Sequence, residues 1–226
     1  MNNDVIIGVE SLRKTYKRNG GSLEILKGID MEIRRGELLG IVGVSGAGKT
    51  TLLQIVGTLD RPTSGSVRFE GADISSLSDD GMAAFRNRTI GFVFQFHHLL
   101  PEFDAVENVM LPCMIKGIPR NEARSRAIDL LDEVGLASRR DHRIGELSGG
   151  EQQRVAICRA LVMNPSVLLA DEPTGNLDKE TSNGVFDLLL SLNRSRKLTV
   201  MMVTHNADLA ARMHRVIRLD DGMIVT

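Results

Sequence analysis

The chain has 226 residues, 42% of them hydrophobic, and 28 lysines and arginines nearly balance 29 acidic residues to leave a net charge of −1. This composition is typical of a globular protein that forms one large domain or two small ones. It gives no support to a nucleic-acid binder held by bulk positive charge. No apolar run approaches the roughly 18 residues that a membrane-spanning helix needs, so we expect none.

Location and redox state are predicted from the first residues and the cysteines. The chain starts MNNDVIIGVES, which is polar and acidic where a secretory signal is basic and then apolar, so a cytoplasmic protein is expected. Cys113 and Cys158 are far apart, and neither belongs to a CxxC pair or to a histidine cluster. Two reduced, buried thiols are therefore expected in preference to a disulfide or a zinc site.

Short alternating or β-branched runs predict strands in the first part of the chain. These runs lie at residues 5–9, 29–33, 38–42, 67–69 and 90–94. After Gly48, apolar residues recur at three- and four-residue steps. This spacing predicts a helix directly behind a glycine-rich turn.

The strand signal disappears between residues 96 and 163, where the segments 121–134 and 150–163 are predicted as amphipathic helices. Strands and helices then alternate again. The predicted elements are strands at 167–170 and 198–203, helices at about 181–194 and 207–213, and a hairpin of 215–219 and 223–225. Such alternation indicates a mostly parallel sheet covered by helices. The predicted core therefore comprises about 1–95 and 164–226, with a helical subdomain at about 96–163 inserted.

A glycine-rich loop is the strongest single motif in the chain. Residues 43–50 read GVSGAGKT, which completes the pattern G-x-x-x-x-G-K-[ST] after an apolar strand and before a helical segment. Glycines let the backbone N–H groups point inward, and the positive end of the following helix adds to the attraction for polyphosphate. The loop is formed by Gly43, Val44, Ser45, Gly46, Ala47 and Gly48. A nucleoside triphosphate is the predicted ligand.

Side chains beside this loop suggest the rest of a nucleotide site. Lys49 is expected to contact the β and γ phosphates, the Thr50 hydroxyl to bind Mg²⁺, and Thr51 to reach a phosphate oxygen. The apolar run VLLA ends in Asp171 and Glu172, and a buried strand should end on two acids only where it opens into a polar site. Asp171 is the expected metal ligand and Glu172 the expected activator of attacking water. A pair of solvated acids is the alternative.

Residues 147–153 read LSGGEQQ, and together with the glycine-rich loop they resemble the signature of the ATPase subunits of ABC transporters. The resemblance covers essentially the whole chain. It implies the α/β P-loop fold of those ATPases, with a mostly parallel core sheet, an antiparallel β part and an inserted helical subdomain. Ser148 also has the chemistry of a helix N-cap, since its oxygen can accept a backbone N–H of the helix that follows.

Four further positions match functional residues of that family. Gln95 occupies the Q-loop position and Asp178, in GNLD, the D-loop position. His205 matches the switch histidine, and Tyr16 the aromatic ring that stacks on adenine. Considered alone, a single histidine after a strand is more often incidental, and a single tyrosine is more often a half-buried amphipathic side chain.

The resemblance implies a shared ATP site. Two copies of the chain would form a homodimer that sandwiches two ATP molecules, with Thr50, Gln95 and Asp171 around Mg²⁺. Glu172 would activate water and His205 would position the γ-phosphate. The signature residues would come from the second copy, with Asp178 at the seam between the copies; they are Ser148, Gly149 and Gly150.

Two segments narrow the resemblance further. ADEPTGNLD resembles the subgroup of lipoprotein-releasing, macrolide-export and cell-division ATPases, and residues 95–112 resemble the lipoprotein-releasing members most. In the family this second segment is where the transmembrane partner docks. Permease subunits of the LolC/LolE kind are therefore implied near residues 95–112, with the ATPase peripheral on the cytoplasmic face of the inner membrane.

Alternatives remain open. They are a macrolide or peptide exporter ATPase, a division ATPase that signals without transport, and a soluble DNA-repair or translation ATPase. The soluble class is disfavoured because the chain has one phosphate loop and no long coiled-coil insertion. His97 and His98 favour a surface or partner contact over a metal site, and the pair Arg139 and Arg140 favours a solvated loop.

Overall fold

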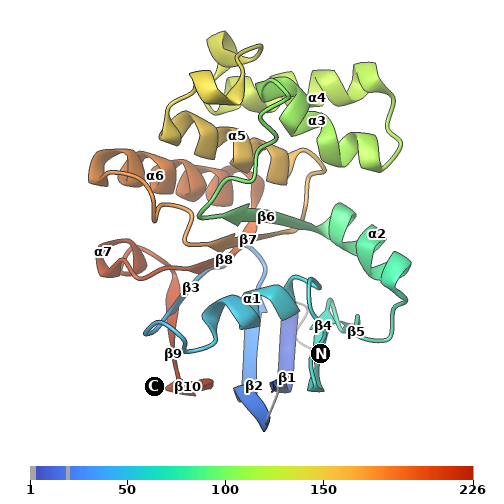
Figure 1. Ribbon diagram of the computed structural model, residues 1–226, viewed down its shortest axis with the longest axis vertical. Coiled ribbons are helices and arrows are strands. Elements are labelled where there is room, and N and C mark those ends of the chain that lie inside the picture. The colour runs from blue at the N-terminus through green and yellow to red at the C-terminus, as the bar shows by residue number, and fades with distance from the viewer. Residues whose placement is uncertain (1–3, 19–20, 226) are drawn as a thin grey trace.

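The computed structural model describes residues 4–18 and 21–225, and its centre is a six-stranded sheet (Figure 1). The strand order is β10-β9-β3-β8-β7-β6, and all neighbours run parallel except the β9–β10 hairpin. The strands are β3 Leu38–Val42, β6 Ile90–Phe94, β7 Val167–Asp171, β8 Thr199–Val203, β9 Arg215–Asp220 and β10 Met223–Val225. The mostly parallel core sheet and the closing hairpin are thus confirmed.

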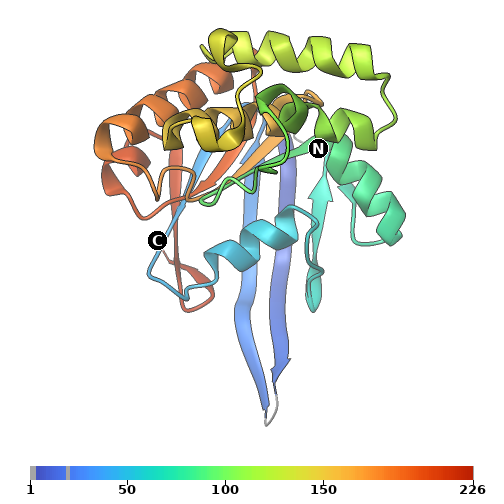
Figure 2. The same cartoon turned by 45° about the horizontal axis from the view of Figure 1, so that its top comes forward.

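A second, antiparallel sheet lies beside it, in the order β2-β1-β4-β5. Its strands are β1 Val5–Arg18, β2 Gly21–Arg34, β4 Ser64–Phe69 and β5 Ala72–Asp73. Figure 2 shows β1 and β2 extending well beyond the helices. The strand predicted at residues 5–9 is too short, because β1 continues to Arg18 and Tyr16 lies within it, not after it. Register shifts, including one between Val9 and Leu12, interrupt the alternation that would have revealed its length.

Helices form the rest of the molecule. They are α1 Lys49–Val56, α2 Asp79–Thr89, α3 Ala105–Ile115, α4 Arg120–Glu133, α5 Gly149–Leu161, α6 Lys179–Arg196 and α7 Ala207–Ala210, with short 3-10 turns at Ala137–Arg139 and Ile144–Glu146. The helices predicted after Gly48 and near 121–134, 150–163 and 181–194 are confirmed, whereas α2 and α3 were not predicted. The helix predicted at 207–213 is shorter than expected, because α7 ends at Ala210. It gives way to tight turns that bring His214 Nδ1 to the Leu38 amide at 3.0 Å.

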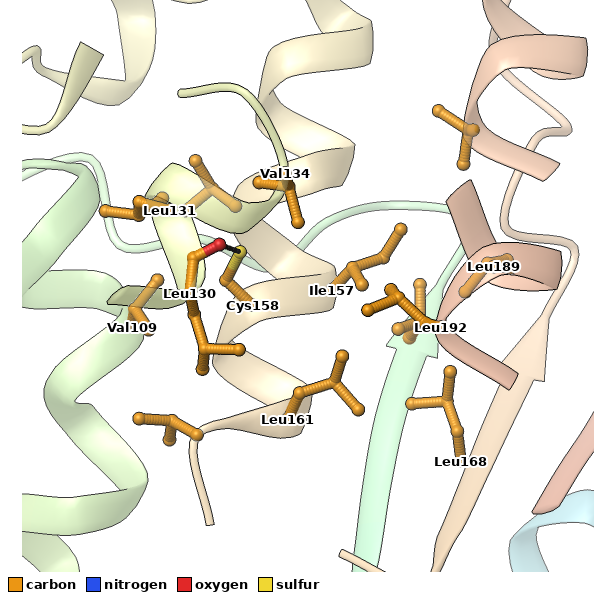
Figure 3. Close-up of a cluster of buried hydrophobic side chains, with 14 of the residues drawn as sticks. Val109, Leu130, Leu131, Val134, Ile157, Cys158, Leu161, Leu168, Leu189 and Leu192 are labelled. Atoms are coloured by element: carbon orange, nitrogen blue, oxygen red, sulfur yellow. Dashed lines mark hydrogen bonds between the residues drawn. The ribbon is translucent and has the colours of Figure 1, made fainter. Parts of the chain in front are cut away.

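The central sheet separates two apolar cores because alternate side chains point to opposite faces. In β7, Leu168 and Ala170 pack into the cluster with α3 to α6, while Val167 and Leu169 pack into the cluster with α1 and the antiparallel sheet. Figure 3 shows the helical cluster, where the thiol of Cys158 contacts the Leu130 carbonyl oxygen at 3.4 Å. The expected free, buried thiols are confirmed, and burial raises the pKa of both.

Parallel pairing has a direct consequence for the polar residues. The carboxyl ends of β3, β6, β7 and β8 lie along one edge of the sheet, so the segments that follow them meet there. These segments contain the glycine-rich loop, Gln95, the Asp171–Glu172 pair and His205. Among the described residues, no helix is both long and apolar enough to cross a bilayer.

Candidate functional site

A cavity of about 490 Å³ opens at the edge where β3, β7 and β8 end. It brings together most of the residues of the glycine-rich loop and both residues of the acidic pair, as the sequence predicted. Its lining consists of Ile25, Gly43, Ser45, Gly46, Gly48, Lys49, Thr50, Thr51, Asp171, Glu172, Val203 and His205. Ile25 and Val203 carry no signal that distinguishes them in sequence, because they reach the cavity only through the packing of β2 and β8 around the loop.

Two glycines of the loop are required by space as well as by backbone conformation. At Gly43, which has φ of 155°, a Cβ would lie 2.1 Å from the Leu219 carbonyl oxygen. At Gly48, which has φ of 98° and is the N-cap of α1, a Cβ would lie 2.9 Å from Leu26 Cδ2. Gly48 offers no capping side chain, so the first N–H groups of α1 remain available to an anion at the positive end of the helix.

Lys49 is the first residue of α1 and places a cation inside the loop. Its Nζ donates hydrogen bonds of 2.9 Å to the carbonyl oxygens of Gly43 and Val44. Val44 itself is exposed, and Ala47 is buried beneath the loop. Ala47 therefore supplies packing and a backbone N–H.

The two acids after β7 have different environments. Asp171 is part of the strand, and burial together with the charge of Glu172 raises the pKa of its carboxyl group, although Thr50 and Lys49 act in the opposite direction. Glu172 has φ of 48°, the left-handed region that non-glycine residues seldom adopt. Its amide donates to the Val203 carbonyl and its carbonyl accepts from the Gly175 amide, each at 3.0 Å.

This backbone conformation aims the Glu172 side chain at His205. Glu172 Oε2 lies 2.9 Å from His205 Nδ1 and also accepts the His205 amide at 3.3 Å. The carboxylate is 17% exposed, whereas the imidazole is 70% exposed, so one partner is held in the cavity and the other extends out of it. Strained backbone of this kind persists where the surrounding structure fixes it, and it is concentrated at functional sites.

Gln95 is not among the residues that line the cavity. Its Nε2 donates to Asn176 Oδ1 at 2.9 Å, and Asn176 Nδ2 donates back to the Gln95 carbonyl at 3.2 Å. This reciprocal pair joins the segment after β6 to the segment after β7. Sequence reasoning gave Asn176 no role, although it lies in the same GNLD segment as Asp178.

The signature residues lie at the start of α5, and they too are absent from the cavity lining. The predicted N-cap is confirmed as a capping box, in which Ser148 Oγ accepts the Glu151 amide and Glu151 Oε2 accepts the Ser148 amide. Gly149 is exposed, and a Cβ at Gly150 would lie 2.5 Å from Thr181 Cγ2 of α6. Asp178 caps that helix by accepting the Thr181 amide at 3.0 Å.

Tyr16 also lies outside the cavity lining, on β1. Its hydroxyl donates to Asp60 Oδ2 at 2.7 Å, and its side chain is 37% exposed. The ring is therefore held at one point while part of its surface remains accessible. Neither Asp60 nor the neighbouring Lys14 had a role in the sequence prediction.

The structure also shows what surrounds the histidine pair and the arginine pair. His97 is half-buried against Gln153 Oε1, and burial lowers its pKa; Arg159 donates to the carbonyl oxygens of both His97 and His98. The His97 side chain is thus held by Gln153, whereas His98 is exposed. Arg139 and Arg140 are partly exposed and form ion pairs with Glu151 and Asp132. Within the described part of the chain, no three His, Cys, Asp or Glu side chains cluster as a metal site.

Comparison with known proteins identifies the family. The family model described as "ABC transporter" matches residues 26–175. The lipoprotein-releasing system ATP-binding protein LolD of Syntrophus aciditrophicus is 57% identical over 98% of this chain and 99% of its own length. The LolD protein of Geobacter metallireducens is 56% identical over 97% of this chain and 98% of its own length.

Solved structures agree. The dimeric structure of the bacterial ABC transporter cassette MJ0796 has a TM-score of 0.89 and 40% identity, covering 98% of this chain and 97% of that one. A second structure of the same cassette, with the same TM-score and identity, is a post-hydrolysis state bound to ADP and Pi. The chain therefore belongs to the ABC transporter family and has the fold of its ATP-binding cassettes.

Proposed function

We propose that this chain is the ATP-hydrolysing motor subunit of an ABC transporter that releases lipoproteins from the inner membrane. The observation that carries the ATPase proposal is the convergence of the glycine-rich loop, Asp171, Glu172 and His205 on one cavity. The choice of cargo class is supported by identity of more than half over almost the full length of the LolD proteins.

The phosphates of ATP would lie in the loop, where backbone N–H groups, the start of α1 and Lys49 supply positive potential. The cavity residues also fit Mg²⁺, a cation that prefers hard oxygen ligands. The Thr50 hydroxyl and the Asp171 carboxylate both line the cavity, and burial makes the ionised carboxylate costly without a nearby cation. When bound, Mg²⁺ would neutralise charge that develops on the phosphate oxygens.

The chemical step would depend on Glu172 and His205. Held by its strained backbone, the Glu172 carboxylate would accept a proton from the water that attacks the γ-phosphate. His205 contacts the same carboxylate and extends from the cavity, which suits a group that positions the γ-phosphate at the open side. Catalysis here would consist mainly of positioning and charge stabilisation.

Replacing the proposed base tests this assignment. Glu172→Gln should keep ATP binding but reduce turnover by roughly 10²- to 10⁴-fold, because the amide cannot accept the proton. The variant should also accumulate as an ATP-linked dimer in size-exclusion chromatography. Glu32→Gln is a matched control at an exposed glutamate of β2. Near-normal hydrolysis by Glu172→Gln would remove Glu172 from the role.

The partner proposal is supported by an apolar groove of about 460 Å³ beside residues 95–112. It is bordered by α2, β6, α3 and α5, and its lining includes Phe92, Leu111, Ile115 and Met163. Ile115 is 78% exposed, and Phe96 at the start of the same segment is 67% exposed. We assign this surface to permease subunits of the LolC/LolE kind, with the chain peripheral on the cytoplasmic face of the inner membrane.

Identifying the membrane proteins that copurify with the chain tests the cargo proposal. Recovery of a lipoprotein-releasing permease would support it, and recovery of a macrolide-export or division partner would replace it.

A further inference from the structure

Tyr16 is held by two residues for which the ATPase mechanism gives no role. Lys14 and Tyr16 are two residues apart on β1, so their side chains leave the same face of the strand. Lys14 Nζ lies 4.7 Å from the centroid of the Tyr16 ring, which is the geometry of a cation–π contact. The ammonium group therefore covers one face of the ring.

Asp60 joins these two side chains. Its Oδ1 accepts a hydrogen bond of 2.7 Å from Lys14 Nζ, and its Oδ2 accepts one of 2.7 Å from the Tyr16 hydroxyl. Lys14 Nζ also donates to the Arg61 carbonyl oxygen at 2.7 Å. Lys14 is only 9% exposed. A lysine side chain so deeply buried needs hydrogen-bond partners, and Asp60 and the Arg61 carbonyl supply them.

The same cluster is tied to the phosphate loop. Asp60 follows α1 by a short turn, and its amide donates back to the Gln54 carbonyl of that helix at 3.3 Å. The hydrogen bonds at Asp60 thus connect the end of β1 to the helix whose first residues form the phosphate site. A ring fixed in this way keeps a constant position relative to the loop.

We infer that Lys14 and Asp60 are positioning residues for nucleotide binding, which hold the Tyr16 ring so that only its uncovered face can receive the base. The inference rests on the proposed stacking of adenine on Tyr16. Stacking on an aromatic side chain contributes a factor of roughly 5 to 150 in affinity. If the ring is free to move before ATP binds, binding must also immobilise it, and the affinity for ATP is then about three- to tenfold lower.

Comparing two ligands separates the contribution of the base to binding from that of the phosphates. ATP needs both the ring and the loop, whereas inorganic triphosphate needs only the loop, and both affinities are measured by calorimetry. Tyr16→Ala should weaken ATP binding and leave triphosphate binding unchanged. Lys14→Met and Asp60→Asn should each weaken ATP binding about three- to tenfold, again without an effect on triphosphate. Lys14→Arg, which retains the cation, should recover most of the affinity, and Lys17→Met is the control at an exposed lysine of the same strand.

A double variant shows whether Lys14 acts through the ring. Added to Tyr16→Ala, Lys14→Met should cause no further loss of ATP affinity. Tyr16 is the sole tyrosine in a chain without tryptophan, so tyrosinate absorbance reports on this ring alone. Burial, followed by the hydrogen bond to Asp60, raises the pKa of Tyr16. Asp60→Asn should lower that pKa, because the neighbouring negative charge is removed.

The outcomes distinguish the stacking of adenine on Tyr16 from the positioning of Tyr16 by Lys14 and Asp60. If Tyr16→Ala leaves ATP affinity unchanged, the stacking role fails and the inference fails with it. If Tyr16→Ala weakens ATP binding but Lys14→Met and Asp60→Asn do not, only the positioning inference is overturned. An equal loss for ATP and triphosphate, or a further loss in the double variant, would mean that Lys14 stabilises the loop itself and would also overturn it.

Discussion

Asp171, the proposed metal ligand, opposes the stability of the fold that carries it. Because burial raises the pKa of its carboxyl group, the folded protein binds this proton more tightly than the unfolded chain does. The contribution of Asp171 to stability therefore falls as the pH rises from the usual pKa of an aspartate to the raised one. Above that window the ionised carboxylate remains a net cost until a cation compensates for it.

Asp171→Asn should accordingly stabilise the nucleotide-free protein at neutral pH by about 0.5–2 kcal/mol, as stabilising replacements at strained functional sites commonly do. The expected rise in Tm is about 1–8 °C for a chain of this size. The dependence of stability on pH in the acid range should also become flatter. Thermal unfolding followed by circular dichroism measures both effects.

Asp220→Asn, at an exposed aspartate that ends β9, is the matched control and should change little. In the presence of Mg²⁺ and ATP the wild type should become more stable than Asp171→Asn. The variant lacks the proposed metal ligand, so it gains less stability from binding. A nucleotide-free Asp171→Asn protein that is less stable than the wild type would show that the ionised carboxylate is already well compensated.

At the scale of residues, the sequence was sufficient to predict those site residues that are recognised by residue type and local spacing. The loop, Lys49, Thr50 and the two acids are contiguous within their motifs, and the parallel sheet alone brings them to one cavity. The contacts of Tyr16 with Asp60 and of Gln95 with Asn176 could not be predicted. They join segments more than 40 residues apart, and the residues involved are common surface types.

The pair formed by Gln95 and Asn176 belongs to the scale of elements, because it holds together the two segments that follow β6 and β7. If Gln95 is a ligand of Mg²⁺ as proposed, its side-chain amide must first leave Asn176. Asn176→Ala removes that competing hydrogen bond, which has a net value of about 0.5–1.5 kcal/mol. The Mg²⁺ concentration for half-maximal ATP hydrolysis should therefore fall by roughly two- to tenfold.

A second variant makes the test specific. Gln95→Ala should raise the Mg²⁺ midpoint, and Asn176→Ala should give no gain in that background, because there is no amide left to release. An unchanged midpoint in Asn176→Ala would mean that Gln95 does not approach the cation, and Gln95 would then have to be withdrawn as a ligand.

Helices were predicted correctly where the apolar residues recur at a clear helical period, and α3 was missed because its apolar residues show no such period. The apolar residues of α4 and α5 recur on one face, and both helices were predicted to within a few residues. In α3, apolar residues surround the helix and Pro112 lies inside it, so no face stands out. Its start is nevertheless marked by a capping box of Asp104 and Glu107, a signal that was available in the sequence.

On the scale of the whole molecule, the structure separates two sets of functional residues. The cavity holds the phosphate loop and the acids, while Ser148, Gly149, Gly150 and Asp178 lie at the starts of α5 and α6 and do not line it. One chain thus carries both parts of the proposed site on different surfaces. Two copies related by a twofold axis would complete both proposed sites at once, because such an interface is reciprocal.

Ser148→Arg tests this arrangement. The arginine should destroy the contact of the signature with the nucleotide of the second copy, so hydrolysis should be lost while ATP binding to the monomer stays within about twofold of the wild type. The change also removes the N-cap of α5, which costs about 1 kcal/mol of stability. Ser148→Ala, which removes the same cap without bulk, controls for that effect, and Ser191→Arg on an exposed position of α6 controls for the added charge.

Mixing two inactive variants gives the sharper measurement. Lys49→Ala lacks the phosphate lysine but has an intact signature, and Ser148→Arg has an intact cavity but lacks the signature. A mixed dimer contains one complete site, formed by the cavity of the Ser148→Arg chain and the signature of the Lys49→Ala chain. ATP hydrolysis should therefore reappear on mixing and increase with protein concentration, since it depends on association of two chains. If the signature served the cavity of its own chain, no mixture would recover activity, and the two surfaces would have to meet by a rearrangement within one copy.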